Sequence, residues 1–158
     1  MKGRTMKSIA RYAPLAARIL FGLLFLVFGL NGFLHFIPQP PLPERAMAFV
    51  GGLASTGYMF PLIKGGEVVV GILLLVNRFV PLALALIAPN VVNIVLFHVI
   101  LEPSGIPMAL AILVVELYLA WSYRAAYRSM LAARVAPSPL ATTPSEAHLH
   151  AHAHRAGI

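Results

Sequence analysis

The sequence predicts an all-α protein of the membrane, a bundle of four transmembrane helices. Hydrophobic residues make up 59% of its 158 residues and charged residues only 11%, whereas an average soluble domain has about 25% charged residues. The mean hydropathy is +0.84. One soluble domain of this length could not bury so much apolar surface, so lipid must cover part of it. The apolar runs are continuous rather than alternating, which favours spanning helices over the strands of a barrel.

The first predicted span covers residues 19–37. This run is long enough for the ~20 helical residues that cross a bilayer. Prolines crowd the segment 38–43 and end the helix, because proline cannot continue it. In the loop that follows, residues 47–53 are expected to form a short interfacial helix. A signal peptide cleaved near Ala46 is the alternative, but the apolar core of a signal peptide is typically only about 7–15 residues long.

Three further spans are predicted at residues 58–76, 79–101 and 106–123. A tight turn at Asn77 and Arg78 joins the second span to the third. Pro81 lies in the first turn of the third span, where proline is tolerated, and Pro89 lies in its middle, where we expect a kink. Glycines in the first two spans are expected to permit close packing of helices. These glycines are Gly22, Gly29, Gly32, Gly65, Gly66 and Gly71.

Composition divides the chain into three parts. Residues 15–125 form the predicted transmembrane domain, which follows a basic segment, residues 1–14. Residues 126–158 form a basic tail rich in proline, alanine and histidine, a composition typical of disorder. Alternate histidines of an extended tail would lie on one side and could bind zinc, nickel or copper, or bind metal only adventitiously. These tail histidines are His148, His150, His152 and His154.

Positive charges near the span ends predict the orientation of the chain. Nine lysines and arginines flank the predicted spans on the side that holds both termini, and only Arg45 lies on the opposite side. By the positive-inside rule, both termini and the turn at Asn77 face the cytoplasm. The formal net charge of +7 sits mostly at the two ends of the chain, which fits anionic lipid better than nucleic acid.

The amino-acid content also excludes some chemistry. The chain has no cysteine, so thiol exchange, iron–sulfur ligation and thiolate-ligated zinc on this chain are excluded. No phosphate-binding glycine loop, nucleophile elbow or zinc-protease motif occurs. The expected partners are the lipid bilayer, other membrane subunits and a further copy of the chain.

Polar residues within the spans are the candidate functional residues. An ionisable group in a spanning helix costs about 2.5–3.5 kcal/mol, so it usually faces a partner or a cavity. In the predicted topology these residues gather from the middle to the outer side of the bundle, and the inner half is almost purely apolar. The candidates for lining a ligand pocket are Asn31, His35, Lys64, Glu67, Asn90, Asn93, His98 and Glu116.

Helical spacing predicts which of these side chains meet. Asn31 and His35 are four residues apart and are expected to share one face of the first span. Lys64 and Glu67 are three residues apart and can form an ion pair. One face of the third span is expected to hold Asn90, Asn93 and Phe97.

Several interpretations of this polar set stay open. The groups could hydrogen-bond to one another and hold the bundle together. They could instead line a pocket that opens outward and binds a small molecule or passes protons. His35 and His98 have similar predicted depths on different helices and could ligate a b-type haem from both sides. A quinone is the favoured cofactor, because a histidine, an acid and aromatic residues could line its site.

Three short motifs resemble the DoxX family of small bacterial membrane proteins. They are FLVFGLNGF at 25–33, GGE at 65–67 and NRFVPLAL at 77–84, and the resemblance covers roughly residues 15–125. It implies a four-helix bundle in the bacterial inner (plasma) membrane and an association with quinone-linked respiratory oxidation. It also implies residues that line the bundle interior. These are Asn31, Glu67, Asn90 and Asn93.

Two functional hypotheses follow from the residues and the resemblance. The first is an accessory subunit of a quinone-linked membrane redox system, with no assigned catalytic residue on this chain. The second is a module that binds or transports a lipid or small amphiphile without chemistry, or a membrane scaffold.

Overall fold

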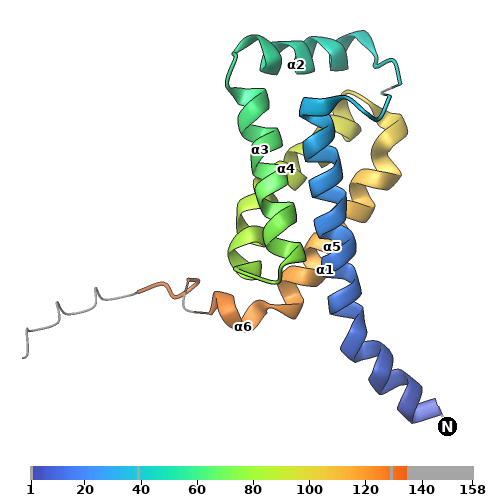
Figure 1. Cartoon of the computed structure of the whole chain (residues 1–158), viewed down its shortest axis with the longest axis vertical. Coiled ribbons are helices and arrows are strands. Elements are labelled where there is room, and N and C mark those ends of the chain that lie inside the picture. The colour runs from blue at the N-terminus through green and yellow to red at the C-terminus, as the bar shows by residue number, and fades with distance from the viewer. Residues whose placement is uncertain (1, 39, 129, 135–158) are drawn as a thin grey trace, which may run out of the picture. The chain divides into compact units, whose positions relative to one another are not determined.

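The computed structural model describes residues 2–38, 40–128 and 130–134, with side chains from Tyr12 onward. All regular secondary structure in these residues is helical (Figure 1). The elements are α1 (Lys2–Leu34), α2 (Glu44–Ser55), α3 (Met59–Leu75), α4 (Val80–Ile100), the 3-10 helix η1 (Pro103–Gly105), α5 (Ile106–Ser122) and α6 (Arg124–Tyr127). Residues 130–134 belong to a second unit, 129–158, and form turns and irregular backbone.

Several of these helices could span a membrane. The segments Tyr12–Leu34, Val80–Ile100 and Pro103–Ser122 are long and apolar enough to cross it. Helix α3 has 17 residues, which is about 26 Å at 1.5 Å per residue, and it counts as a fourth span only if it is joined to α2. The prediction of an all-helical fold with several helices that could span a membrane is confirmed for the described residues, and the fourth span stays a prediction.

Helix α1 differs from the predicted first span at both ends. It begins at Lys2 and runs through Pro14, so no break marks the end of the basic segment 1–14. It ends at Leu34 because His35 adopts a left-handed backbone conformation, with φ of 51°. The side chain of Asn31 then hydrogen-bonds the backbone of Ile37, with Ile37 N donating to Oδ1 at 2.6 Å. The prediction that Asn31 and His35 share a helix face is therefore wrong.

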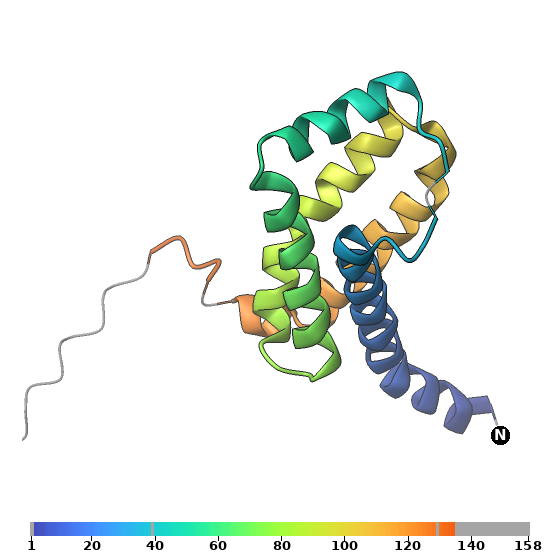
Figure 2. The ribbon, with the colours of Figure 1, turned by 45° about the horizontal axis from the view of Figure 1, so that its top comes forward.

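Helix α2 lies across one end of the bundle. It meets α3 at a bend of 90°, and both views of the ribbon show it crossing the end at which α3 begins (Figures 1 and 2). Gly57 permits the bend with φ of 74°, and the Thr56 hydroxyl accepts a hydrogen bond from Met59 N at 3.0 Å. The helix is longer than the predicted segment 47–53. We call this end, where α1 and α4 finish and α3 and α5 begin, the α2 end.

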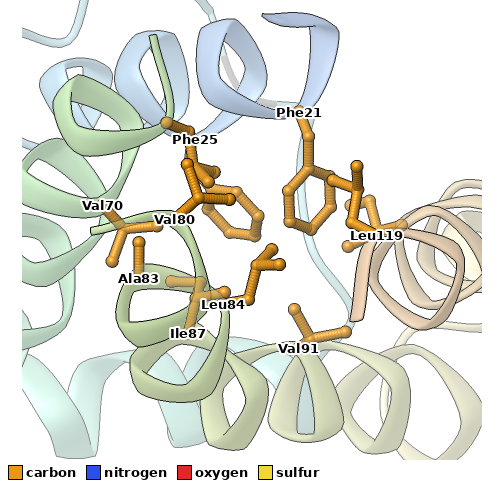
Figure 3. Packing of buried hydrophobic residues seen from close by; sticks show 11 residues of the cluster. Phe21, Phe25, Val70, Val80, Ala83, Leu84, Ile87, Val91 and Leu119 are labelled. Atoms are coloured by element: carbon orange, nitrogen blue, oxygen red, sulfur yellow. The ribbon is translucent and has the colours of Figure 1, made fainter. Parts of the chain in front are cut away.

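The hydrophobic core lies among α1, α3, α4 and α5. Phe21 and Phe25 of α1 meet edge to face, with ring centroids 4.9 Å apart, and point at α4 and α5 (Figure 3). They pack with buried residues of the other three helices. These include Val70, Leu74, Leu84, Ile87, Val91 and Leu119.

Glycines let α1 and α3 approach closely. A Cβ added at Gly71 would lie 2.6 Å from the backbone nitrogen of Leu26, and one added at Gly29 would lie 2.9 Å from that of Val68. A Cβ added at Gly22 would lie 3.1 Å from the Leu74 and Leu75 side chains, and one added at Gly32 would lie 2.5 Å from the Lys64 side chain. The prediction of close packing is confirmed at these four positions. It is wrong for Gly65 and Gly66, where an added Cβ meets nothing within 4 Å.

A buried arginine stabilises the opposite end of α3. The guanidinium of Arg18, only 5% exposed, donates hydrogen bonds to the carbonyl oxygens of Leu74 and Leu75. These carbonyls belong to the last turn of α3, where backbone acceptors lack partners within the helix and a positive charge is favourable. Arg18 therefore joins α1 to the end of α3.

Candidate functional site

Glu67 is the centre of a polar group at the α2 end. Its carboxylate is 3% exposed and accepts two hydrogen bonds at 2.9 Å. Lys64 Nζ donates to Oε2 from one turn earlier on α3, and Asn90 Nδ2 donates to Oε1 from α4. The predicted pair of Lys64 and Glu67 is confirmed. Both carboxylate oxygens are thus held, and the bond to Asn90 ties α3 to α4.

A second polar group joins the end of α4 to the start of α5. His98 Nδ1 lies 2.8 Å from Glu102 Oε2 and 3.1 Å from the Glu102 carbonyl oxygen. The same carboxylate accepts hydrogen bonds from Gly105 N at 3.1 Å and from the Ser104 hydroxyl. No room exists for a side chain at Gly105, because an added Cβ would overlap the His98 ring. These contacts fix both the turn and the imidazole.

Glu102 makes the stability of this turn depend on pH. Chiefly the Ser104 hydroxyl, with help from His98 and Gly105, holds the pKa of Glu102 below its ordinary value of 4.5. A depressed pKa means that the folded state favours the carboxylate, so this stabilisation is present above pH 4.5 and is lost as the pH falls through the folded pKa. We expect the thermal midpoint of the Glu102→Gln variant to fall less on acidification than that of the wild type. Glu44→Gln, at an exposed site, is the control, and an equal acid sensitivity of wild type and Glu102→Gln would contradict the prediction.

Two adjoining cavities lie between α2, α3 and α4 at this end. The larger cavity has a volume of about 600 Å³ and a mainly apolar wall that includes Phe49, Leu62 and Leu86. The smaller has a volume of about 170 Å³. The two share four lining residues, which makes them neighbours along one groove. The shared residues are Leu53, Ile63, Asn90 and Asn93.

The small cavity gathers most of the predicted polar candidates. Its wall includes Lys64 and Glu67 from α3 and Asn90, Asn93 and His98 from α4. Phe60 and Phe97 add aromatic surface, and Val50 and Leu53 of α2 contribute to the wall. Asn90, Asn93 and Phe97 line this one cavity, as their shared face predicts.

Three predicted candidates lie elsewhere. Asn31 is buried and holds the chain beyond α1, as described above, and His35 is exposed. Glu116 of α5 is 5% exposed, and its Oε2 makes no hydrogen bond to any residue that the structure describes. Neither of the two cavities is lined by these residues. Residues with similar predicted depths in the membrane therefore do not all line one site.

The metal and haem hypotheses receive no geometric support. His98 lines the small cavity, whereas His35 is exposed and lines neither of the two cavities. Within residues 2–38, 40–128 and 130–134, no group of three or more acidic or histidine side chains could hold a metal ion. The tail candidates lie outside the described residues.

Sequence reasoning missed two residues that shape this region and the bundle. Glu102 is not among the candidate residues, although its spacing of four residues from His98 is the spacing at which helical side chains meet. Arg18 counts in the sequence only as one of the basic residues that flank the predicted spans. Its role depends on how α1 packs against the end of α3, which the sequence does not report.

The hydroxyl of Tyr127 ties α6 back to the start of α4. It donates to the carbonyl oxygen of Pro81 at 2.8 Å. Burial raises the pKa of Tyr127 above its ordinary value of 10.0, and the nearby Glu116 acts in the same direction. This contact lies at the end of the bundle opposite the cavities, so it supports the helices and takes no part in the site.

Comparison with known proteins finds no relative of this chain. No protein-family model, no curated protein and no solved structure matches the chain. The functional argument therefore rests on the residues and cavities described above.

Proposed function

We propose that this chain is a DoxX-like protein of the bacterial inner membrane that binds a quinone as an accessory subunit of a quinone-linked redox system. The observation that carries the proposal is the pair of adjoining cavities. The smaller one has Lys64, Glu67 and His98 in its wall, and the larger one has no charged residue among the described residues of its mainly apolar wall. A ligand with a polar ring and an apolar tail would place the ring in the small cavity and the first part of the tail in the large one.

The sizes of the cavities support this assignment. A cavity of about 150 Å³ accepts one benzene ring in an engineered protein, and the small cavity has about 170 Å³. The large cavity, at about 600 Å³, lies within the range of about 300–1,000 Å³ that is typical of ligand pockets. The small cavity thus suits a single substituted ring better than the bulkier head group of a phospholipid.

The charges on the wall also favour a neutral head group. The ammonium of Lys64 and the carboxylate of Glu67 form an ion pair and neutralise each other. The wall therefore offers no unpaired positive charge to a phosphate or carboxylate. It offers hydrogen-bonding groups instead, which are what a ring with two oxygen substituents requires.

The proposal includes a topology. Helix α3 is the fourth span and α2 lies in the outer interface, with both termini in the cytoplasm. The cavities are then in the outer half of the membrane, and the apolar one meets the lipid in which a quinone tail dissolves. A quinone would supply electron and proton transfer to partner subunits, and this chain would bind and orient it.

Two glycines of α3 offer a matched test of this binding. Gly66 lines the large cavity, Gly65 lines neither cavity, and both have open space at Cβ. We expect quinone to accompany the wild type and the Gly65→Leu variant through gentle extraction, and the Gly66→Leu variant to retain at least about tenfold less. Native mass spectrometry with an absorption spectrum of the same sample measures this. Wild-type protein without quinone, or equal retention by the two variants, would sink the proposal.

A lipid or small amphiphile without redox chemistry is the second candidate. The mainly apolar wall of the large cavity favours it, because this surface would accept an acyl chain as readily as an isoprenoid tail. The same mass spectrum would then contain a lipid in place of quinone. Transport of that compound should fall in a Glu67→Gln variant, and a membrane scaffold would show neither ligand nor transport.

A further inference from the structure

His98 has a fixed tautomer. Its Nδ1 contacts both the carbonyl oxygen and the carboxylate of Glu102. A backbone carbonyl oxygen can only accept a hydrogen bond, so Nδ1 must carry the proton and donate it. In the neutral imidazole the other nitrogen, Nε2, then has a lone pair and no proton.

The surroundings of the ring keep this arrangement in place. The Phe97 ring meets the His98 ring edge to face, with centroids 5.2 Å apart. Gly105 lies against the Nδ1 and Cε1 edge, with no space for a side chain between them. Nε2 has no hydrogen-bond partner among the described residues, and His98 lines the small cavity. Nε2 is therefore the ring nitrogen left for a ligand.

We infer that His98 makes the small cavity select the reduced, hydroxyl-bearing form of a quinone over the oxidised, carbonyl-bearing form. This inference rests on the proposed function. A quinol hydroxyl can donate to Nε2, whereas a quinone carbonyl oxygen would place one acceptor against another. Glu102 acts through His98 as a positioning residue, because it holds the proton on Nδ1.

Lys64 and Asn90, which line the same cavity, do not distinguish the two forms. Lys64 Nζ and Asn90 Nδ2 each carry protons beyond the one that each donates to Glu67. An oxygen of the ligand can accept a hydrogen bond from one of these groups whether it is a hydroxyl or a carbonyl oxygen. The hydrogen bond at His98 corresponds to about a tenfold difference in affinity.

The test compares a short-tailed quinone with its quinol on the full chain in lipid nanodiscs. Calorimetric titration without oxygen should give about tenfold tighter binding of the quinol. The His98→Phe variant should lose this preference, so that its affinities for the quinol and the quinone become equal. His35→Phe is the matched control, because His35 is exposed and lines neither cavity.

A second measurement uses the wild-type protein alone, so it does not require a variant to fold. Nitrogen NMR of labelled histidine should show His98 protonated at Nδ1, and added quinol should shift the signal of Nε2 while added quinone does not. Equal binding of the two forms by the wild type, or a preference that survives His98→Phe, would overturn the inference and leave the proposed function standing. Failure of both forms to bind would overturn the proposed function and the inference with it.

Discussion

Replacing Gly71 with alanine is expected to destabilise the protein by about 2 kcal/mol, although alanine is the better helix former by about 1 kcal/mol. The added methyl would lie 2.6 Å from the backbone nitrogen of Leu26 and 2.9 Å from the carbonyl oxygen of Gly22. Backbone atoms of a packed helix cannot move aside as the end of a flexible side chain can. Overpacking of this kind costs about 1–3 kcal/mol and more where the helices must separate.

The matched control for Gly71→Ala is Gly65→Ala on the same helix. An added Cβ at Gly65 meets nothing within 4 Å, so the helix propensity of alanine should stabilise this variant by up to about 1 kcal/mol. Unfolding in mixed micelles, followed by circular dichroism, gives both free energies. Similar values for the two variants would contradict the close approach of α1 and α3.

The sequence predicts best the features of this fold that hydropathy reports. Hydropathy gives the length of each apolar segment, so the predicted spans 79–101 and 106–123 match α4 and α5 to within a few residues. Hydropathy does not report the end of α1, where His35 has a left-handed backbone and Asn31 binds the backbone of Ile37. The 90° bend before α3 is likewise set by the turn at Thr56 and Gly57, whose geometry hydropathy does not report.

The contacts of the candidate site also differ in how well the sequence predicts them. The pair of Lys64 and Glu67 could be predicted because both residues lie on one helix at a spacing of three. The bond from Asn90 to Glu67 crosses between helices, and its formation depends on the rotation of α4 against α3. Predicted depth alone groups Glu116 with these residues, but Glu116 lines neither of the two cavities.

Replacing Glu67 with leucine is expected to destabilise the protein by about 3 kcal/mol. The substitution removes the partner of Lys64, whose side chain is 22% exposed, and one partner of the Asn90 amide. A buried charge left without its partner costs about 3–5 kcal/mol, and partial exposure of Lys64 places the expected cost at the lower end of this range. The free energy of unfolding in mixed micelles measures it.

Glu116→Leu is the matched comparison, because it makes the same change at a second buried glutamate of a long apolar helix. Glu116 Oε2 has no hydrogen-bond partner among the described residues, so loss of this carboxyl leaves no partner unpaired there and should be neutral or stabilising. Adding Lys64→Leu to Glu67→Leu should restore most of the lost stability, since the unpaired ammonium is then gone. If the two glutamate variants are equally destabilised, or if Lys64→Leu worsens Glu67→Leu, the ion pair does not hold α3 as the geometry indicates. Glu67 has two hydrogen-bond partners and also lines the small cavity. In the Glu67→Leu variant, the stability of the protein and its binding of any ligand should therefore fall together. The Glu116→Leu variant should leave the ligand bound.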